Sequence, residues 1–135
     1  MRYLLSMTML TFCFLASAQN GSEAALLAQQ QLDGYNARDI DAFLKPYSDS
    51  VKIFNHPNEL QYSGKEGMRK RYTGVFERSP DLHCTLVDRM VLGNIVMDQE
   101  SVIFGKGGTP VKVIVMYKVA HGKIQEVYFI EPDQK

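Results

Sequence analysis

The amino-acid sequence predicts an α+β fold in which a curved antiparallel sheet wraps over three N-terminal helices. Apolar residues recur at helical spacing in the first half of the chain, and the spacing changes to a period of two after Pro80. The dipeptides Gly93-Asn94 and His121-Gly122 then separate alternating runs, as two-residue hairpin turns do. Helices followed by a meander of strands indicate an α+β class.

The first 18 residues have the three parts of a secretory signal peptide. Arg2 supplies a positive charge, residues 4–15 are apolar, and residues 16–18 (ASA) form a small-x-small cleavage site. The apolar block is shorter than the roughly 20 residues of a membrane-spanning helix, which leaves a buried or anchoring helix as the alternative. We expect residues 1–18 to be removed on export, to the periplasm or outside the cell, and residues 19–135 to form one domain without a membrane anchor.

The composition argues against several classes of partner. Lys+Arg and Asp+Glu number 15 each, and the formal net charge is 0, so no nucleic-acid partner is expected. Cys84 is the only cysteine in residues 19–135, which predicts a fold without an internal disulfide and a buried, inert thiol. The three histidines share no metal-binding spacing, and we expect neither a metal nor a cofactor.

The first two helices are expected close together. Residues 22–36 (SEAALLAQQQLDGYN) carry apolar side chains at helical spacing, with Ser22 as the N-cap. Residues 38–47 (RDIDAFLKPY) predict a short second helix that Asp39 caps and Pro46 ends.

A strand at residues 50–55 (SVKIFN) precedes the third helix. Ser63 and Glu66 in "SGKE" have the spacing of a capping box, which predicts where this helix begins. Its buried side is expected to consist of Met68, Tyr72, Val75 and Phe76, and its outward side of Arg69, Lys70 and Arg71.

Four strands follow, at residues 82–92, 95–104, 111–120 and 123–130. Counting back from the two turns gives the expected cross-strand pairs, which include an Arg89–Asp98 salt bridge. The face expected to look toward the helices carries His83, Val87, Arg89, Asp98, Glu100, Val102, Val113, Val115, Tyr117, Glu126, Tyr128 and Ile130. The other face carries Leu86, Met90, Met97, Ile114, Met116, Val127 and Phe129, with Asp88, Lys112 and Lys118 among them.

The second face is too apolar to meet water alone, and its methionines are adaptable in packing. We therefore expect a homodimer formed through the outer face of the sheet. The glycine-rich segment 105–110 (GKGGTP) lacks the strand–helix context of a phosphate-binding loop and receives no nucleotide role.

Three stretches, "YNARDIDAFLKPYSDSVKIFN", "GKEGMRKRY" and "YKVAHGKIQEVYF", resemble the SnoaL-like branch of the nuclear transport factor 2-like superfamily. The resemblance covers nearly all of residues 29–130. It implies a cone-shaped fold with a cavity between sheet and helices. The superfamily includes ketosteroid isomerase, polyketide cyclases, hydrolases, dehydratases and domains that only bind or dimerise, so the resemblance leaves the activity open.

The candidate site lies on the inward face of the sheet. Glu100 is expected among valines, where burial would raise its pKa into the range of a general acid or base, with a structural ion pair or a position near the open rim as the alternative. His56, next to Asn55 at a strand end, is a second candidate catalytic residue, with a rim residue as the alternative reading. The residues expected to line a pocket for a small hydrophobic molecule are Tyr35, Asn55, His83, Val115, Tyr117 and Tyr128.

The resemblance also argues against the ketosteroid isomerase mechanism, in which an Asp base works with a Tyr and a protonated Asp. The corresponding positions fall at or beside Asn55, near Gln31 and at Val115, and none of these side chains keeps its expected role. Two hypotheses remain: an exported enzyme that transfers a proton on an apolar carbonyl compound, and a non-catalytic ligand-binding or accessory dimerisation domain.

Overall fold

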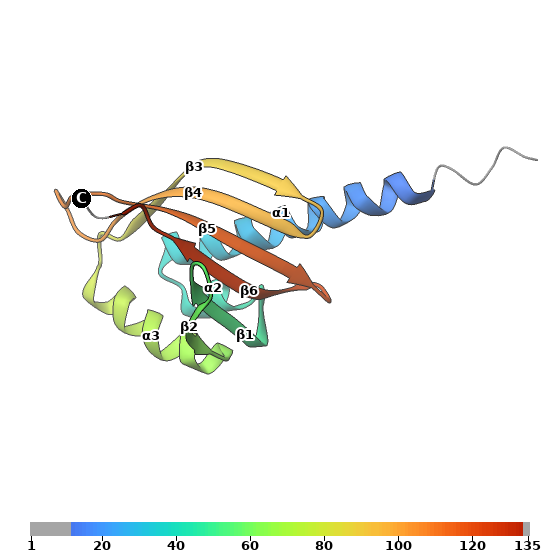
Figure 1. Ribbon diagram of the computed structural model, residues 1–135. Helices are drawn as coiled ribbons and strands as arrows, with labels where there is room; N and C mark the ends of the chain where they lie inside the picture. The colour runs from blue at the N-terminus through green and yellow to red at the C-terminus, as the bar shows by residue number, and fades with distance from the viewer. Residues whose placement is uncertain (1–11, 134–135) are drawn as a thin grey trace, which may run out of the picture.

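The computed structural model describes residues 12–133 as three helices and one six-stranded sheet (Figure 1), with side chains described for residues 23–133. The helices are α1 (Phe12–Ala37), α2 (Ile40–Leu44) and α3 (Lys65–Arg78). The strands are β1 (Tyr47–Asn55), β2 (Glu59–Ser63), β3 (His83–Leu92), β4 (Ile95–Ile103), β5 (Val111–Ala120) and β6 (Lys123–Ile130). The expected α+β class is confirmed.

The N-terminal helix begins earlier than expected. α1 starts at Phe12 rather than after Ser22, so the residues before Ser22 continue the same helix. The expected signal peptide therefore falls partly on the first turns of α1, and residues 1–11 lie outside the described residues. Within the described chain, none of the helices has the length and apolarity needed to cross a membrane.

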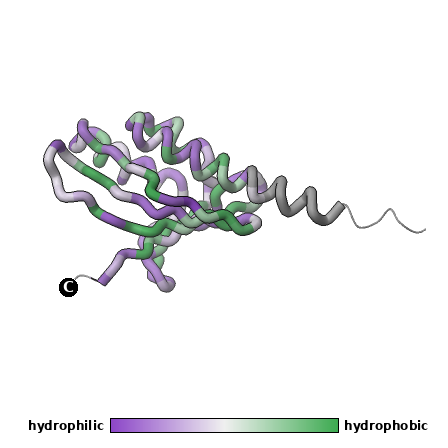
Figure 2. The backbone as a smooth tube through the Cα atoms, turned by 90° about the horizontal axis from the view of Figure 1, so that it is seen from above, coloured by the Kyte–Doolittle hydropathy of each residue, from purple (hydrophilic) through white to green (hydrophobic). Residues whose placement is uncertain are grey.

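The sheet has the strand order β2-β1-β6-β5-β4-β3 and arches over the helices, so that its concave face looks toward α1, α2 and α3 (Figure 1). β1 runs parallel to β6, and the other neighbouring strands are antiparallel. The sequence reading missed β2, because this edge strand is mostly exposed and shows no alternation of buried residues. Figure 2 shows hydrophobic and hydrophilic stretches interleaved along the sheet.

The last turn of α1 is held to the start of β3. The Asn36 amide donates to the Cys84 carbonyl (2.9 Å) and accepts from the Cys84 N–H (2.8 Å), as a neighbouring strand would. Asp39 caps α2 as expected by accepting from the N–H groups of Asp41 and Ala42. At Gly34 a Cβ would lie 2.3 Å from the Phe43 nitrogen, so glycine permits the close contact of α1 with α2.

The capping box expected at the start of α3 is wrong. Ser63 ends β2, where it pairs with Lys52, and Gly64 at φ 86° turns the chain into the helix without a side-chain cap. The rest of the α3 prediction is confirmed for Met68 and Phe76, which are buried. Arg71 is exposed, as expected, and its side chain also belongs to the lining of the cavity described below.

A β-bulge in β3 reverses part of the expected face assignment. The register with β4 shifts between Leu86 and Asp88, which leaves Val87 without a partner and 55% exposed. As a one-residue shift exchanges the two faces of a strand, Cys84 and Leu86 turn toward the core and His83 is exposed. The inward placement expected for His83 and Val87 is therefore corrected.

A second bulge has the same effect on β6. Lys118 pairs with Glu126 and Val119 with Ile124, so Gln125 is the extra residue. The side chains that change face relative to expectation are Glu126, Val127, Tyr128, Phe129 and Ile130. Counting residue pairs back from a hairpin turn assumes a regular ladder of hydrogen bonds. The predicted pairs are therefore correct only between the turn and the first bulge.

The outer, convex face of the sheet combines apolar and charged groups. Met90 is 62% exposed and Ile114 38% exposed. Beside them, Glu126 accepts from Tyr128 (2.9 Å) and pairs with Lys118 (3.3 Å). The apolar surface is thus interrupted by an ionic cluster.

Candidate functional site

A cavity of about 340 Å³ lies between the concave face of the sheet and the helices, at the lower end of the range for small-molecule sites. Its side nearest the helices is aromatic, with Tyr35, Phe43 and Tyr72 in the lining. Phe76 lies outside the lining and packs on these rings, and the four rings form mutual contacts with centroid distances from 4.6 to 6.2 Å. The strands contribute valines and, from β6, Phe129. The cavity therefore suits a largely apolar molecule.

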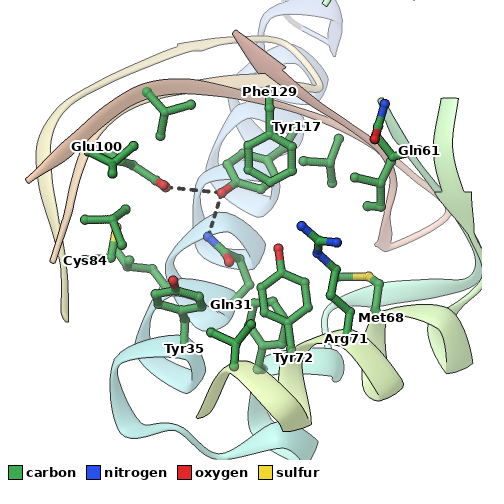
Figure 3. A pocket seen from close by; sticks show the side chains of 18 of the residues that line it. Gln31, Tyr35, Gln61, Met68, Arg71, Tyr72, Cys84, Glu100, Tyr117 and Phe129 are labelled. Atoms are coloured by element: carbon green, nitrogen blue, oxygen red, sulfur yellow. Dashed lines mark hydrogen bonds between the residues drawn. The ribbon is translucent and has the colours of Figure 1, made fainter. Parts of the chain in front are cut away.

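A chain of hydrogen bonds crosses the cavity wall and ends at Glu100. The Tyr47 hydroxyl donates to Gln31 Oε1 (3.1 Å), and Gln31 Nε2 donates to the Tyr117 hydroxyl (2.8 Å). Tyr117 in turn donates to Glu100 Oε1 (3.3 Å), and Figure 3 shows the last two of these bonds. The chain joins β1, α1, β5 and β4, and it fixes the orientation of the carboxyl group.

Glu100 is 7% exposed, and its pKa is raised to about 7. Burial is the main cause, because it disfavours the charged carboxylate, and the negative charge of Asp98 acts in the same direction. Hydrogen bonds from Cys84 and Tyr117 and the positive charge of Arg89 oppose the shift but do not cancel it. Near neutral pH, Glu100 is therefore divided between acid and carboxylate forms.

Asp98 is fully buried on the same face of β4, and it is paired. Arg89 donates through Nε and Nη2 to its two carboxylate oxygens, at 2.7 Å each, and through Nη1 to Gln29 Oε1 (3.0 Å). This confirms the salt bridge expected from the register. The pair gives Asp98 a structural role and places a fixed negative charge near Glu100.

Cys84 is buried and lines the cavity beside Glu100. Burial raises the pKa of its thiol well above the ordinary value, and the charge of Glu100 adds to the shift. The thiol therefore stays protonated, which does not favour a nucleophile.

The mouth of the cavity is polar. Asn55 from β1, Gln61 from β2, Arg71 from α3 and Glu131 after β6 all belong to its lining. Figure 3 shows Arg71 extending toward the cavity from the side away from Glu100. The site thus has a buried polar end at Glu100, an apolar middle and a charged mouth.

The candidate residues from the sequence fall into two groups. The lining includes Glu100, Tyr35, Asn55 and Tyr117. The residues outside the lining are His56, His83, Val115 and Tyr128. His56 is exposed in the turn after β1, and Val115 is a core residue with 1% exposure, so neither contacts the cavity. His83 and Tyr128 face away because of the bulges in β3 and β6.

Sequence reasoning missed several lining residues, among them Gln31, Gln61, Arg71, Cys84 and Phe129. The helical spacing of Gln31 with the buried residues Ala28 and Leu32 is a signal for its inward position. No comparable local signal exists for Arg71, because an arginine on an amphipathic helix normally faces solvent. In the described part of the chain, no cluster of three His, Cys, Asp or Glu side chains has the geometry to hold a metal ion.

Comparison with known proteins gives a family match over most of the chain. A family model described as a SnoaL-like domain matches residues 28–127. No curated protein matches the sequence.

Solved structures share the fold. An uncharacterized cystatin fold protein from Novosphingobium aromaticivorans is 27% identical, with a TM-score of 0.74 over 80% of this chain and 97% of its own. A SnoaL-like protein of unknown function from Burkholderia thailandensis is 17% identical, with a TM-score of 0.67, and the match covers 80% of this chain and 92% of that protein. An LEH-like epoxide hydrolase from M. tuberculosis is 16% identical, with a TM-score of 0.65, and the match covers 82% of this chain and 83% of that protein.

Proposed function

The chain belongs to the SnoaL-like domain family, and we propose that it is an enzyme that transfers a proton on a small, largely apolar carbonyl compound bound in the cavity. The observation that carries the proposal is the position of Glu100, buried in the cavity wall with a pKa of about 7. A carboxyl group with this pKa accepts and returns a proton at neutral pH. The fold itself is compatible with many activities and does not indicate which reaction takes place.

In the proposed step, the Glu100 carboxylate removes a proton from the carbon next to the carbonyl group. The C–H bond breaks, the proton passes to Glu100, and the electron pair moves to the carbonyl oxygen. That oxygen needs a hydrogen-bond donor as its charge develops. Tyr35 directs its hydroxyl into the cavity from α1 (Figure 3) and is the donor in this proposal.

Hydrogen–deuterium exchange tests the proposal without a known product. A panel of small ketones and aldehydes is incubated with the protein in D₂O, and loss of the proton next to the carbonyl is followed by NMR. We expect exchange with the wild type, loss of most of it in Glu100→Gln, and little change in Glu77→Gln, an exposed control on α3. Exchange that is equal in wild type and Glu100→Gln would refute the role of Glu100.

A non-catalytic binding domain is the second candidate. It is favoured by the residues where the three positions of the ketosteroid isomerase mechanism fall, at or beside Asn55, near Gln31 and at Val115, since none of these three side chains is a carboxyl or phenol group. Binding of carbonyl compounds without exchange at any pH from 5 to 9 would support this candidate over the enzyme.

We also propose that the protein is exported, because residues 1–18 have the pattern of a signal peptide. Mass spectrometry of the protein from an exporting host is expected to give a chain that begins at Gln19. A full-length chain in the cytoplasmic fraction would contradict export.

For assembly, we propose a homodimer through the outer face of the sheet. The exposure of Met90 and Ile114 supports this proposal. Sedimentation at micromolar concentration is expected to show a dimer that Ile114→Lys dissociates. A wild-type monomer at that concentration would refute the dimer.

A further inference from the structure

Arg71 differs in its surroundings from Lys65 and Arg69 on the same helix. Lys65 pairs with Asp49 at 3.4 Å, and Arg69 pairs with Asp41 at 2.8 Å. Among the described residues, Arg71 forms no salt bridge within 4.0 Å. Its guanidinium carbon lies 5.7 Å from the centre of the Tyr62 ring, which holds the charge at the cavity mouth.

A second, shallow groove continues from this mouth along α3. It shares Tyr62, Arg71 and Val75 with the cavity, and its further lining includes Lys70 and Arg78. The groove lining therefore carries three cationic side chains and no carboxylate. Such an arrangement attracts anions toward the mouth.

Other side chains at the cavity mouth have opposite effects on the binding of an anion. The amides of Asn55 and Gln61 can donate hydrogen bonds there. Glu131 also belongs to the lining, and its negative charge opposes an anion. Together these contributions predict that removing Arg71 or removing Glu131 will change anion binding in opposite directions.

We propose that the cavity takes an amphipathic anion, whose apolar body lies between the helices and the sheet and whose carboxylate or phosphate group lies at Arg71. The guanidinium group can bind either head group through two parallel hydrogen bonds. The apolar middle of the cavity accommodates a short hydrocarbon body, and the far end presents Glu100 and Tyr117 to a second polar group of the same molecule.

This inference deepens the proposed function, because it takes the same cavity as the ligand site and names the class of ligand. The two can fail separately. Binding of an anion at Arg71 does not need proton transfer, and proton transfer on a neutral ketone does not need Arg71.

Calorimetric titration with three probes of equal chain length tests the inference: octanoate, octyl phosphate and 1-octanol. We expect wild-type protein to bind at least one of the two anions about tenfold more tightly than the alcohol, as one charge-assisted contact provides. Arg71→Gln is expected to remove this preference while the affinity for 1-octanol changes less than about twofold. The relative affinity of the two anions identifies the head group.

Two further variants make the result specific. Arg69→Gln removes the same charge from α3 at a residue outside both hollows, and it should keep the preference for the anion. Glu131→Gln should strengthen anion binding. Equal affinity of wild type for anion and alcohol, or an equal loss in Arg69→Gln and Arg71→Gln, would overturn the inference. Loss of anion binding in Arg71→Gln without deuterium exchange on any carbonyl compound would uphold it and refute the proposed enzyme.

Discussion

Asp98 and Glu100 both face the concave side of β4, but only Asp98 is paired with a cation. Arg89 contacts both oxygens of Asp98 at 2.7 Å, whereas Glu100 accepts a hydrogen bond from Tyr117 at 3.3 Å. Within the described residues, no salt bridge includes Glu100. One strand therefore presents a carboxylate with a structural role and a carboxyl group that titrates near neutral pH.

Glu100 is expected to make stability fall as pH rises. Its pKa is about 7 in the folded protein and near the ordinary 4.5 when unfolded, so between these values the folded state binds more protons. The contribution to the free energy of unfolding decreases from pH 4.5 and is about 3 kcal/mol lower above pH 7. Urea unfolding of wild type and Glu100→Gln at several pH values from 4.5 to above 7 measures this contribution. We expect the variant to become more stable relative to the wild type as pH rises. A constant difference between the two would contradict the raised pKa.

Tyr117→Phe is expected to raise the pKa of Glu100 further. The hydroxyl of Tyr117 stabilises the carboxylate, and its removal also leaves Gln31 Nε2 without its acceptor, at a cost of about 1–3 kcal/mol in stability. Carbon-13 NMR of the Glu100 carboxyl measures the shift. Tyr128→Phe is the matched control, because Tyr128 donates to Glu126 on the outer face and should leave Glu100 unchanged. A lower pKa in Tyr117→Phe would refute this reading of the hydrogen bond.

Gly34→Ala is expected to destabilise the protein by about 1–3 kcal/mol or more. The new Cβ would lie 2.3 Å from the backbone nitrogen of Phe43, so α1 and α2 must move apart. Gly67→Ala is the control within α3, because the nearest atom, Tyr62 Cδ2, is at an ordinary 3.6 Å. The control should be neutral or more stable by up to about 1 kcal/mol, since alanine favours a helix. Denaturant midpoints distinguish the two, and equal effects would argue against close packing at Gly34.

Arg89→Ala is expected to cost about 3–5 kcal/mol in stability, because it leaves Asp98 buried without its partner. Arg69→Ala removes a comparable contact from Asp41 at the surface, where solvent screens it, and should cost less than about 1 kcal/mol. Chemical denaturation compares the two variants. A loss below about 1 kcal/mol for Arg89→Ala would contradict the dependence of Asp98 on this single partner.

The class of fold and most of its helices and strands could be predicted from the amino-acid sequence. The change from helical to alternating spacing after Pro80, and the turns at Gly93-Asn94 and His121-Gly122, were enough to place the last four strands. These signals are local: turn chemistry and side-chain periodicity depend on residues close in sequence. The Arg89–Asp98 pair was also predictable, because it lies between the Gly93-Asn94 turn and the bulge in β3.

The sequence placed Glu100, Tyr35, Asn55 and Tyr117 in the cavity, but the other lining residues depend on contacts between elements that are distant in sequence. The extra residues Val87 and Gln125 each shift a strand by one position, and that shift exchanged Cys84 for His83 and Phe129 for Tyr128 in the lining. Arg71 reaches the mouth because of where α3 lies against the sheet edge, which no neighbouring residue in the sequence specifies. A period of two fixes a face only while the ladder stays regular, and its irregularities are set by packing of the whole domain.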